Sequence, residues 1–335
     1  MNSQQSSTSD LDIQTGAQDR SLAADTRTTA ANATNQPEPE PEPEPEVLIV
    51  GGLKLFVFGL DQLRAKHRVG DFPSVSVCFF AHGRKSSPNK YFKFCMRLCQ
   101  DPFGSNNSHS AESGRQSGNH HVIAVAVEQR NHGSRLLSDL QNESWKAGND
   151  RHCYDMWAIQ YGTACDLSYL IDVLPFFLPP ETGAIWRWIV VGVSLGGHST
   201  LLAMAKDERI KIGISIIGCG DYSSLMNYRA KRQPVFVESL RRHDPVHLPL
   251  QFKGRSLLLL HGGDDKLVPS SCSQGFVQEL RSKVYTRAGP QEEGVAVLAD
   301  DAATGRLKWI VEPGVGHTCS PFMEEQSQQW LWSSL

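Results

Sequence analysis

The sequence lacks the long apolar run that a membrane-spanning helix requires. Its longest apolar stretch, 170–178, is interrupted by Asp172 and Pro175, well short of the roughly 20 residues that cross a bilayer. The first residues contain neither a basic start nor an apolar signal core. We therefore expect no membrane span and a cytoplasmic location. The minor alternative is peroxisomal, because Ser333-Ser334-Leu335 is a degenerate form of the Ser-Lys-Leu address without its basic residue.

The common metal and nucleotide signatures are also missing. There is no Cys-x-x-Cys pair, no His-Glu-x-x-His motif and no glycine-rich loop ending in Gly-Lys-Ser/Thr. Eight cysteines are present, but several lie inside apolar runs, and we interpret them as reduced thiols. We expect no cofactor and no metal, so side chains must supply any chemistry.

Charge is low overall and unevenly distributed. The formal net charge is -3, yet the first 46 residues hold nine carboxylates against two arginines, which leaves +4 on the remainder. A charge of +4 over 289 residues, without an Arg/Lys run interleaved with aromatic residues, is too weak for a nucleic-acid surface. Nucleic acid is therefore not an expected partner.

The first 46 residues are polar and end in five Pro-Glu repeats. Such a segment cannot bury apolar area, and repeated prolines with like charges favour a stiff, solvated chain. The sequence predicts a disordered acidic tail over 1–46, with a partner-binding arm as the functional alternative. A single domain is expected over 47–335.

From Val47 onward, short apolar runs alternate with longer amphipathic stretches. Runs this uniformly apolar are typical of parallel strands that are covered on both faces. The expected fold class is α/β, with an open, doubly wound, mostly parallel sheet, helices on both faces and a site at the carboxyl ends of the strands. The expected strands are 75–80, 122–127, 188–191, 212–217, 257–260 and 307–311, after one or two antiparallel strands within 47–58, and the expected helices are 90–100, 155–177, 195–206, 272–284 and 321–332.

Two segments interrupt this alternation. Residues 101–120 have the composition of an inserted surface loop, and 218–254 of a partly helical excursion between two strands. An insertion after a strand end lies at the face where ligands bind. The segment 218–254 is therefore the candidate for a small cap insertion.

The clearest chemical motif is Gly-Val-Ser-Leu-Gly at 192–196, placed between an apolar strand and a predicted helix. A nucleophilic serine at such a sharp turn needs small residues two positions before and after it, because a larger Cβ would collide with the crossing backbone. This context predicts Ser194 as a nucleophile, with an ordinary glycine-rich turn as the alternative. A serine hydroxyl is inert at neutral pH, so it also needs a base and a site for the oxyanion.

The required partners follow in the order acid, then base. Asp264 and Asp265 come directly after the strand 257–260, and the spacing to Val268-Pro269 favours Asp265 as the acid, with Asp264 as the alternative. His317 lies in a glycine-rich loop after the last strand and is the predicted base.

Two backbone N–H groups are candidates for the oxyanion hole. Leu195 follows the nucleophile at the start of a helix, where amides point outward. Arg84 follows His82-Gly83 at the end of the strand 75–80, where glycine permits close backbone approach. The alternative is that His82-Gly83 is only a strand-end turn.

With these motifs, 47–335 resembles the α/β-hydrolase superfamily over nearly its whole length. The segments 192–197, 261–269, 316–317 and 82–83 stand where that family places its elbow, acid loop, base loop and oxyanion loop. Arg130-Asn131-His132-Gly133 resembles its Arg-x-His-Gly loop, which we interpret as structural. The stretch from Asp155 to Pro175 is similar to fungal serine hydrolases related to dienelactone-hydrolase and peptidase-like branches.

The motifs and the resemblance together imply a serine hydrolase that cleaves an ester or thioester of a small molecule through an acyl-enzyme. The serine argues against the branches that use an aspartate nucleophile, such as epoxide hydrolases. Three alternatives stay open: an acyltransferase, a lyase with the same triad, and a non-catalytic ligand-binding protein that has kept the fold.

Overall fold

The computed structural model describes residues 44–104, 119–230, 237–286, 291–292, 295–301 and 305–335. The account below concerns the unit Glu42–Leu335. The predicted tail therefore lies outside the described residues except at its end, where Glu46 is already the first residue of a strand.

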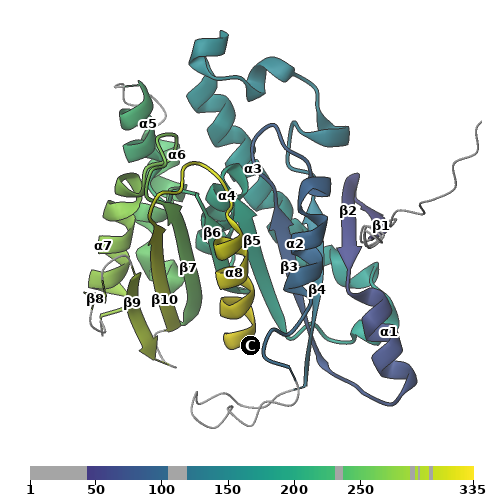
Figure 1. Cartoon of the computed structure of the whole chain (residues 1–335). Helices are drawn as coiled ribbons and strands as arrows, with labels where there is room; N and C mark the ends of the chain where they lie inside the picture. Colours follow the sequence, from purple (N-terminus) through teal and green to yellow (C-terminus); the bar gives the residue numbers. More distant parts are fainter. Residues whose placement is uncertain (1–43, 105–118, 231–236, 287–290, 293–294, 302–304) are drawn as a thin grey trace, which may run out of the picture. The chain divides into compact units, whose positions relative to one another are not determined.

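A ten-stranded sheet forms the centre of this unit (Figure 1). Its spatial order is β1-β2-β4-β3-β5-β6-β7-β10-β9-β8, and the six strands from β4 to β10 in that order are parallel, with antiparallel strands at both edges. The predicted parallel strands and the antiparallel leading pair are confirmed. The strands are β1 (Glu46–Val50), β2 (Leu53–Phe58), β3 (Ser74–Ala81), β4 (His120–Val127), β5 (Arg187–Val193), β6 (Ile210–Ile216), β7 (Arg255–Gly262), β8 (Gln291–Glu292), β9 (Val295–Asp301) and β10 (Gly305–Glu312).

Helices cover both faces of the sheet, because the side chains of each central strand alternate between two apolar cores. On β3, Val77 and Phe79 join one core, whereas Cys78 and Phe80 join the other. The second core is covered by α2 (Phe92–Leu98) and α8 (Pro321–Ser333), which lie in front of the sheet in Figure 1. The first core is covered by α1 (Leu60–Arg68), α3 (His152–Val173), α4 (Leu195–Lys206) and α7 (Gln274–Lys283).

The segment predicted as a cap, 218–254, contains α5 (Tyr222–Ala230), α6 (Val237–His243) and two 3-10 turns, and its residues 231–236 lie outside the described part. Helix α5 contacts the loop after β7: the Tyr228 hydroxyl donates to the Lys266 carbonyl at 3.1 Å. This contact brings α5 to the carboxyl end of the sheet. Most of the predicted loop at 101–120 lies outside the described residues.

The sequence did not predict α1, β8 or β9. Helix α1 is short and mostly polar, and it begins after Gly59, whose φ is 92°. Strand β9 pairs with β10 and β8 at the antiparallel edge of the sheet. All eight cysteines are free, and none of the helices within the described ranges is long and apolar enough to cross a bilayer.

Candidate active site

Ser194 occupies a strained turn between β5 and α4. Its φ of 54° and ψ of -110° are unusual for a residue with a side chain, and such conformations cost on the order of 1–3 kcal/mol. Its amide donates to the Ile216 carbonyl at 2.8 Å, which holds the turn against β6. A Cβ on Gly192 would lie 2.1 Å from the Gly196 carbonyl oxygen, and a Cβ on Gly196 would lie 1.9 Å from that of Ala81. Both glycines are therefore required by the crossing backbone, as the motif predicted.

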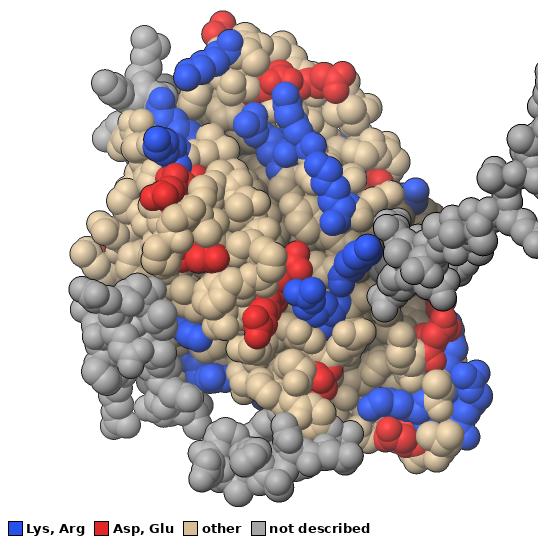
Figure 2. Space-filling view, in the orientation of Figure 1, with Lys and Arg blue, Asp and Glu red and all other residues tan. Residues whose placement is uncertain are grey.

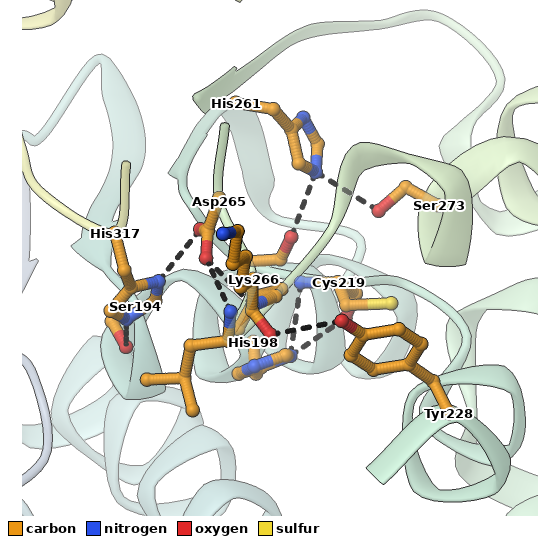
Figure 3. Close-up of polar contacts among 12 residues, drawn as sticks. Ser194, His198, Cys219, Tyr228, His261, Asp265, Lys266, Ser273 and His317 are labelled. Atoms are coloured by element: carbon orange, nitrogen blue, oxygen red, sulfur yellow. Dashed lines mark hydrogen bonds and ion pairs between the residues drawn. The ribbon is translucent and has the colours of Figure 1, made fainter. Parts of the chain in front are cut away.

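The three predicted catalytic side chains meet in one hydrogen-bonded row (Figure 3). Ser194 Oγ lies 2.8 Å from His317 Nε2, and His317 Nδ1 lies 2.7 Å from Asp265 Oδ2. With the Nδ1 proton donated to the carboxylate, Nε2 is left to accept the serine proton. The imidazole is about one-fifth exposed and the carboxylate fully buried. Such an arrangement can activate a hydroxyl as a nucleophile.

The two neighbouring aspartates have different surroundings. Asp264 is exposed, and its amide donates to the Val315 carbonyl at 2.9 Å, which ties the acid loop to the base loop. Asp265 is buried, and its Oδ1 accepts from the amides of Leu267 and Val268 at 2.8 and 2.9 Å. The structure thus brings Asp265, and not Asp264, to His317.

The pKa of the Asp265 carboxyl lies below its ordinary value. Burial alone would raise this pKa, but the hydrogen bonds from His317 and from the Val268 and Leu267 amides outweigh it. Asp265 is therefore a carboxylate at neutral pH, so it can orient His317 and stabilise it once protonated.

The segments proposed for the oxyanion hole adjoin Ser194. Leu195 is the first residue of α4, where helix amides have no acceptor within the helix. A Cβ on Gly83 would lie only 3.7 Å from Ser194 Cβ, so the loop that continues to Arg84 runs beside the nucleophile. The Gly196 amide donates to the His82 carbonyl at 3.1 Å and joins this loop to the elbow.

Buried histidines hold the oxyanion loop in place, a role that the sequence did not reveal. His82 Nε2 accepts from the Gln129 amide at 3.3 Å, and its Nδ1 donates to the Gly83 carbonyl at 2.8 Å. Burial lowers the pKa of His82 to about 4, so the ring is neutral. His132 Nε2 accepts from the Lys85 amide at 3.1 Å. The Arg-x-His-Gly loop therefore positions the neighbouring loop, in agreement with its structural interpretation.

Two further histidines lie beside the site and were also missed (Figure 3). His198 Nδ1 lies within 3.0 Å of the Cys219 backbone, and His261 Nε2 lies 2.9 Å from the Gly218 carbonyl. Trp309 donates to His261 Nδ1 at 3.1 Å. Burial lowers the pKa of His198 to about 3 and that of His261 to about 4. Both rings are neutral packing groups, whereas His317 is the ring that lies within hydrogen-bond distance of Ser194 Oγ.

The site is built from hydrogen-bonded side chains and backbone groups. Across the residues that the structure describes, no group of three or more His, Cys, Asp or Glu side chains could hold a metal ion.

No family model matches the chain. The Bacillus subtilis (strain 168) protein named "Putative esterase YitV" is 25% identical over 132 residues, which cover 35% of this chain and 50% of that protein. The chain thus spans about half the length of this curated relative.

The solved structures that are similar to this one include the following two. TT1662 from Thermus thermophilus has a TM-score of 0.56 and 18% sequence identity, and the match covers 87% of this chain and 98% of that one. An acylaminoacyl peptidase from Pyrococcus horikoshii has a TM-score of 0.50 and 15% identity, with 86% and 40% covered. The fold is the α/β-hydrolase fold. The predicted fold class is therefore confirmed, while the resemblance to a fungal branch stays a prediction.

Proposed function

We propose that this protein is a serine hydrolase that cleaves the ester or thioester bond of a small molecule through an acyl-enzyme. The observation that carries the proposal is the row from Ser194 through His317 to Asp265, with separations of 2.8 and 2.7 Å, built on a serine in a strained turn. The similarity to an esterase-like relative supports the same class of reaction.

In the first half of the reaction, Ser194 Oγ attacks the carbonyl carbon while His317 Nε2 takes the hydroxyl proton. The N–H groups of Leu195 and Arg84 stabilise the oxyanion, a contribution worth roughly a hundredfold to a thousandfold in rate per donor in other enzymes. The intermediate collapses, and His317 gives its proton to the leaving alcohol or thiol. The acyl group is then bonded to Ser194.

In the second half, water replaces the leaving group. His317 accepts a proton from the water, which attacks the acyl carbon, and the carboxylic acid is released as Ser194 regains its proton. Asp265 stays ionised throughout because its carboxylate keeps its three hydrogen bonds.

Covalent labelling tests whether Ser194 is a nucleophile at all. A fluorophosphonate probe should label the wild-type chain and not Ser194→Ala. Absence of labelling in a folded wild-type protein would favour a non-catalytic binding protein.

Turnover assays then separate the enzymatic alternatives. p-Nitrophenyl esters of rising chain length, acyl-CoA thioesters and small lactones should release free acid if the protein is a hydrolase. Labelling without acid release, or acid release that falls when an alcohol or amine is added, would indicate a lyase or an acyltransferase instead.

A further inference from the structure

Two arginines approach the candidate site from different segments. Arg84 directly follows Gly83, which adjoins Ser194. Arg229, in α5, donates from Nε and Nη2 to the Leu267 carbonyl at 3.1 and 3.0 Å, two residues beyond the triad aspartate. Both side chains are partly buried. One guanidinium thus stems from the oxyanion loop and the other is fixed to the acid loop.

Neither guanidinium forms an ion pair with a carboxylate in the part of the chain that the structure describes. Arg84 Nη1 donates to the Asn142 carbonyl at 2.7 Å, and Arg229 bonds only to a carbonyl. A carbonyl oxygen accepts a hydrogen bond, but it does not neutralise a positive charge. The ion pairs of Arg64, Arg130 and Arg209 with nearby carboxylates show the more usual arrangement. Figure 2 shows lysine and arginine side chains interspersed with aspartate and glutamate side chains on one face of the molecule.

The nearby carboxylates have other partners. Glu143, which acts on Arg84 electrostatically, pairs with Lys85. Asp265 bonds to His317. These two carboxylates are therefore engaged by side chains other than the two arginines.

The two arginines also act on each other and on a shared neighbour. Burial lowers the pKa of Arg229, and the charge of Arg84 lowers it further, against an opposing effect of Tyr222. Burial lowers the pKa of His152 to about 4, and both arginines add to that effect. Hydrogen bonds also link their surroundings. The Glu143 carbonyl, next to the Asn142 acceptor of Arg84, bonds to His152 Nδ1 at 2.6 Å, and the Cys153 carbonyl accepts from the Tyr222 hydroxyl, at the start of the Arg229 helix, at 2.6 Å. Both arginines stay charged, so their charges repel.

We propose that Arg84 and Arg229 bind a carboxylate of the substrate, so that the esters or thioesters cleaved at Ser194 are anionic. A carboxylate between them would offset their repulsion and accept charge-assisted hydrogen bonds from planar guanidinium groups. The proposal rests on the proposed hydrolase function and adds a substrate class to it.

The test compares anionic esters with neutral esters of nearly the same shape. Monophenyl adipate against phenyl hexanoate places the charge on the acyl side, and 4-acetoxybenzoate against 4-acetoxybenzamide places it on the leaving group. The measured quantity is the ratio of kcat/KM for the anionic ester to that for the neutral one. A variant that lowers kcat/KM by the same factor for both esters leaves this ratio unchanged.

Arg229→Gln and Arg84→Gln should each lower the ratio about tenfold for at least one pair, as expected when a hydrogen bond to a charged group is lost. Arg229→Lys keeps the positive charge, so its ratio should lie between that of Arg229→Gln and that of the wild type. Arg241→Gln is the matched control, because Arg241 lies on the neighbouring helix α6, is exposed and pairs with Glu238. Its ratio should equal that of the wild type.

A wild-type ratio at or below one for both pairs, or equal ratios in wild type and both Arg→Gln variants, would overturn the proposal and leave the hydrolase function standing. If no ester is turned over, the hydrolase function is wrong. A binding measurement then tests whether Arg84 and Arg229 bind a carboxylate. Monophenyl adipate should bind Ser194→Ala in calorimetry and lose about tenfold in affinity in Ser194→Ala/Arg229→Gln. Absence of binding to Ser194→Ala, or equal affinities, would overturn it.

Discussion

Asp265 bonds to His317 through one carboxylate oxygen only. Oδ2 lies 2.7 Å from His317 Nδ1, while Oδ1 accepts the amides of Leu267 and Val268. The loop backbone therefore fixes the carboxylate, and the carboxylate in turn fixes the plane of the imidazole. An asparagine at this position has only one acceptor oxygen. Its NH2 group would therefore face either the Nδ1–H group of the imidazole or the N–H groups of the two loop amides.

Asp265→Asn should lower kcat by roughly a thousandfold to ten thousandfold, because the wrong histidine tautomer is then favoured. Ser194→Ala and His317→Ala should each abolish most activity, and the double variant should lose little more, because the residues act as one unit. Steady-state kinetics on the best ester measures these losses. Asp264→Asn, at an exposed neighbour, is the control; a severe loss there with a nearly silent Asp265→Asn would assign the acid to Asp264.

Gly196→Ala should destabilise the protein by about 3 kcal/mol or more, because the new Cβ would lie 1.9 Å from a backbone oxygen of Ala81 that cannot move freely. Urea unfolding at neutral pH measures the change in the free energy of unfolding. Gly316→Ala is the matched control, since a Cβ at Gly316 would meet no described atom within 4 Å, and it should change this free energy by less than about 0.5 kcal/mol. Equal stability of the two variants would contradict the close approach at the elbow.

The free energy of unfolding should fall as the pH is lowered from about 6.5 to about 4. Six buried histidines have a lowered pKa, mainly through burial, so the unfolded chain binds more protons than the folded one in this range. Each contributes at most about 1.4 kcal/mol per pH unit, and the stabilisation is complete above the unfolded pKa of about 6.5. The six are His82, His121, His132, His152, His198 and His261.

Urea unfolding at pH 7.5, 6 and 5 measures this dependence. His261→Gln should flatten it, because one of the buried rings no longer titrates. His247→Gln, at an exposed position, should leave it unchanged. A free energy of unfolding that stays constant over these pH values would show that the buried histidines do not resist protonation.

His132→Ala should lower kcat by about tenfold to a hundredfold with little change in KM, because the Lys85 amide loses its acceptor and the oxyanion loop is held less firmly. His132→Gln, which can accept the same hydrogen bond, should keep more of the activity. Circular dichroism of both variants checks that the fold is retained. A loss confined to KM would place His132 in substrate binding instead.

The sequence predicted those features of the fold and site that require one particular residue pattern. Parallel strands that are buried on both faces have uninterrupted apolar runs, so β3 to β7 and β10 could be located. The turn at Ser194 requires glycine at 192 and 196, because a Cβ there would clash with the backbone, so its motif could be recognised. The order of acid and base after Ser194 could then be predicted. The spacing to Val268-Pro269 favoured Asp265 over Asp264. The burial that distinguishes the two aspartates depends on the folded loop, so the alternative stayed open.

Features that depend on remote contacts could not be predicted. Arg229 reaches the acid loop from α5, and its polar surroundings in sequence do not differ from those of other surface arginines. Strand β9 forms by pairing with β10 at the edge of the sheet, and its short apolar run, 295–299, ends in two aspartates, which strands disfavour. Helix α1 is too short and too polar for periodicity to identify it.

The elbow and the histidine that serves it are 123 residues apart along the chain, and the histidine is 52 residues from the aspartate. Contacts across such distances form only after long loops have closed, which makes them slow compared with the closing of single helices and turns. In a refolding experiment, helical signal should therefore return before Ser194 becomes reactive towards a covalent probe. The reactivity of Ser194 thus reports the final ordering of the chain, whereas spectroscopic signals of secondary structure do not.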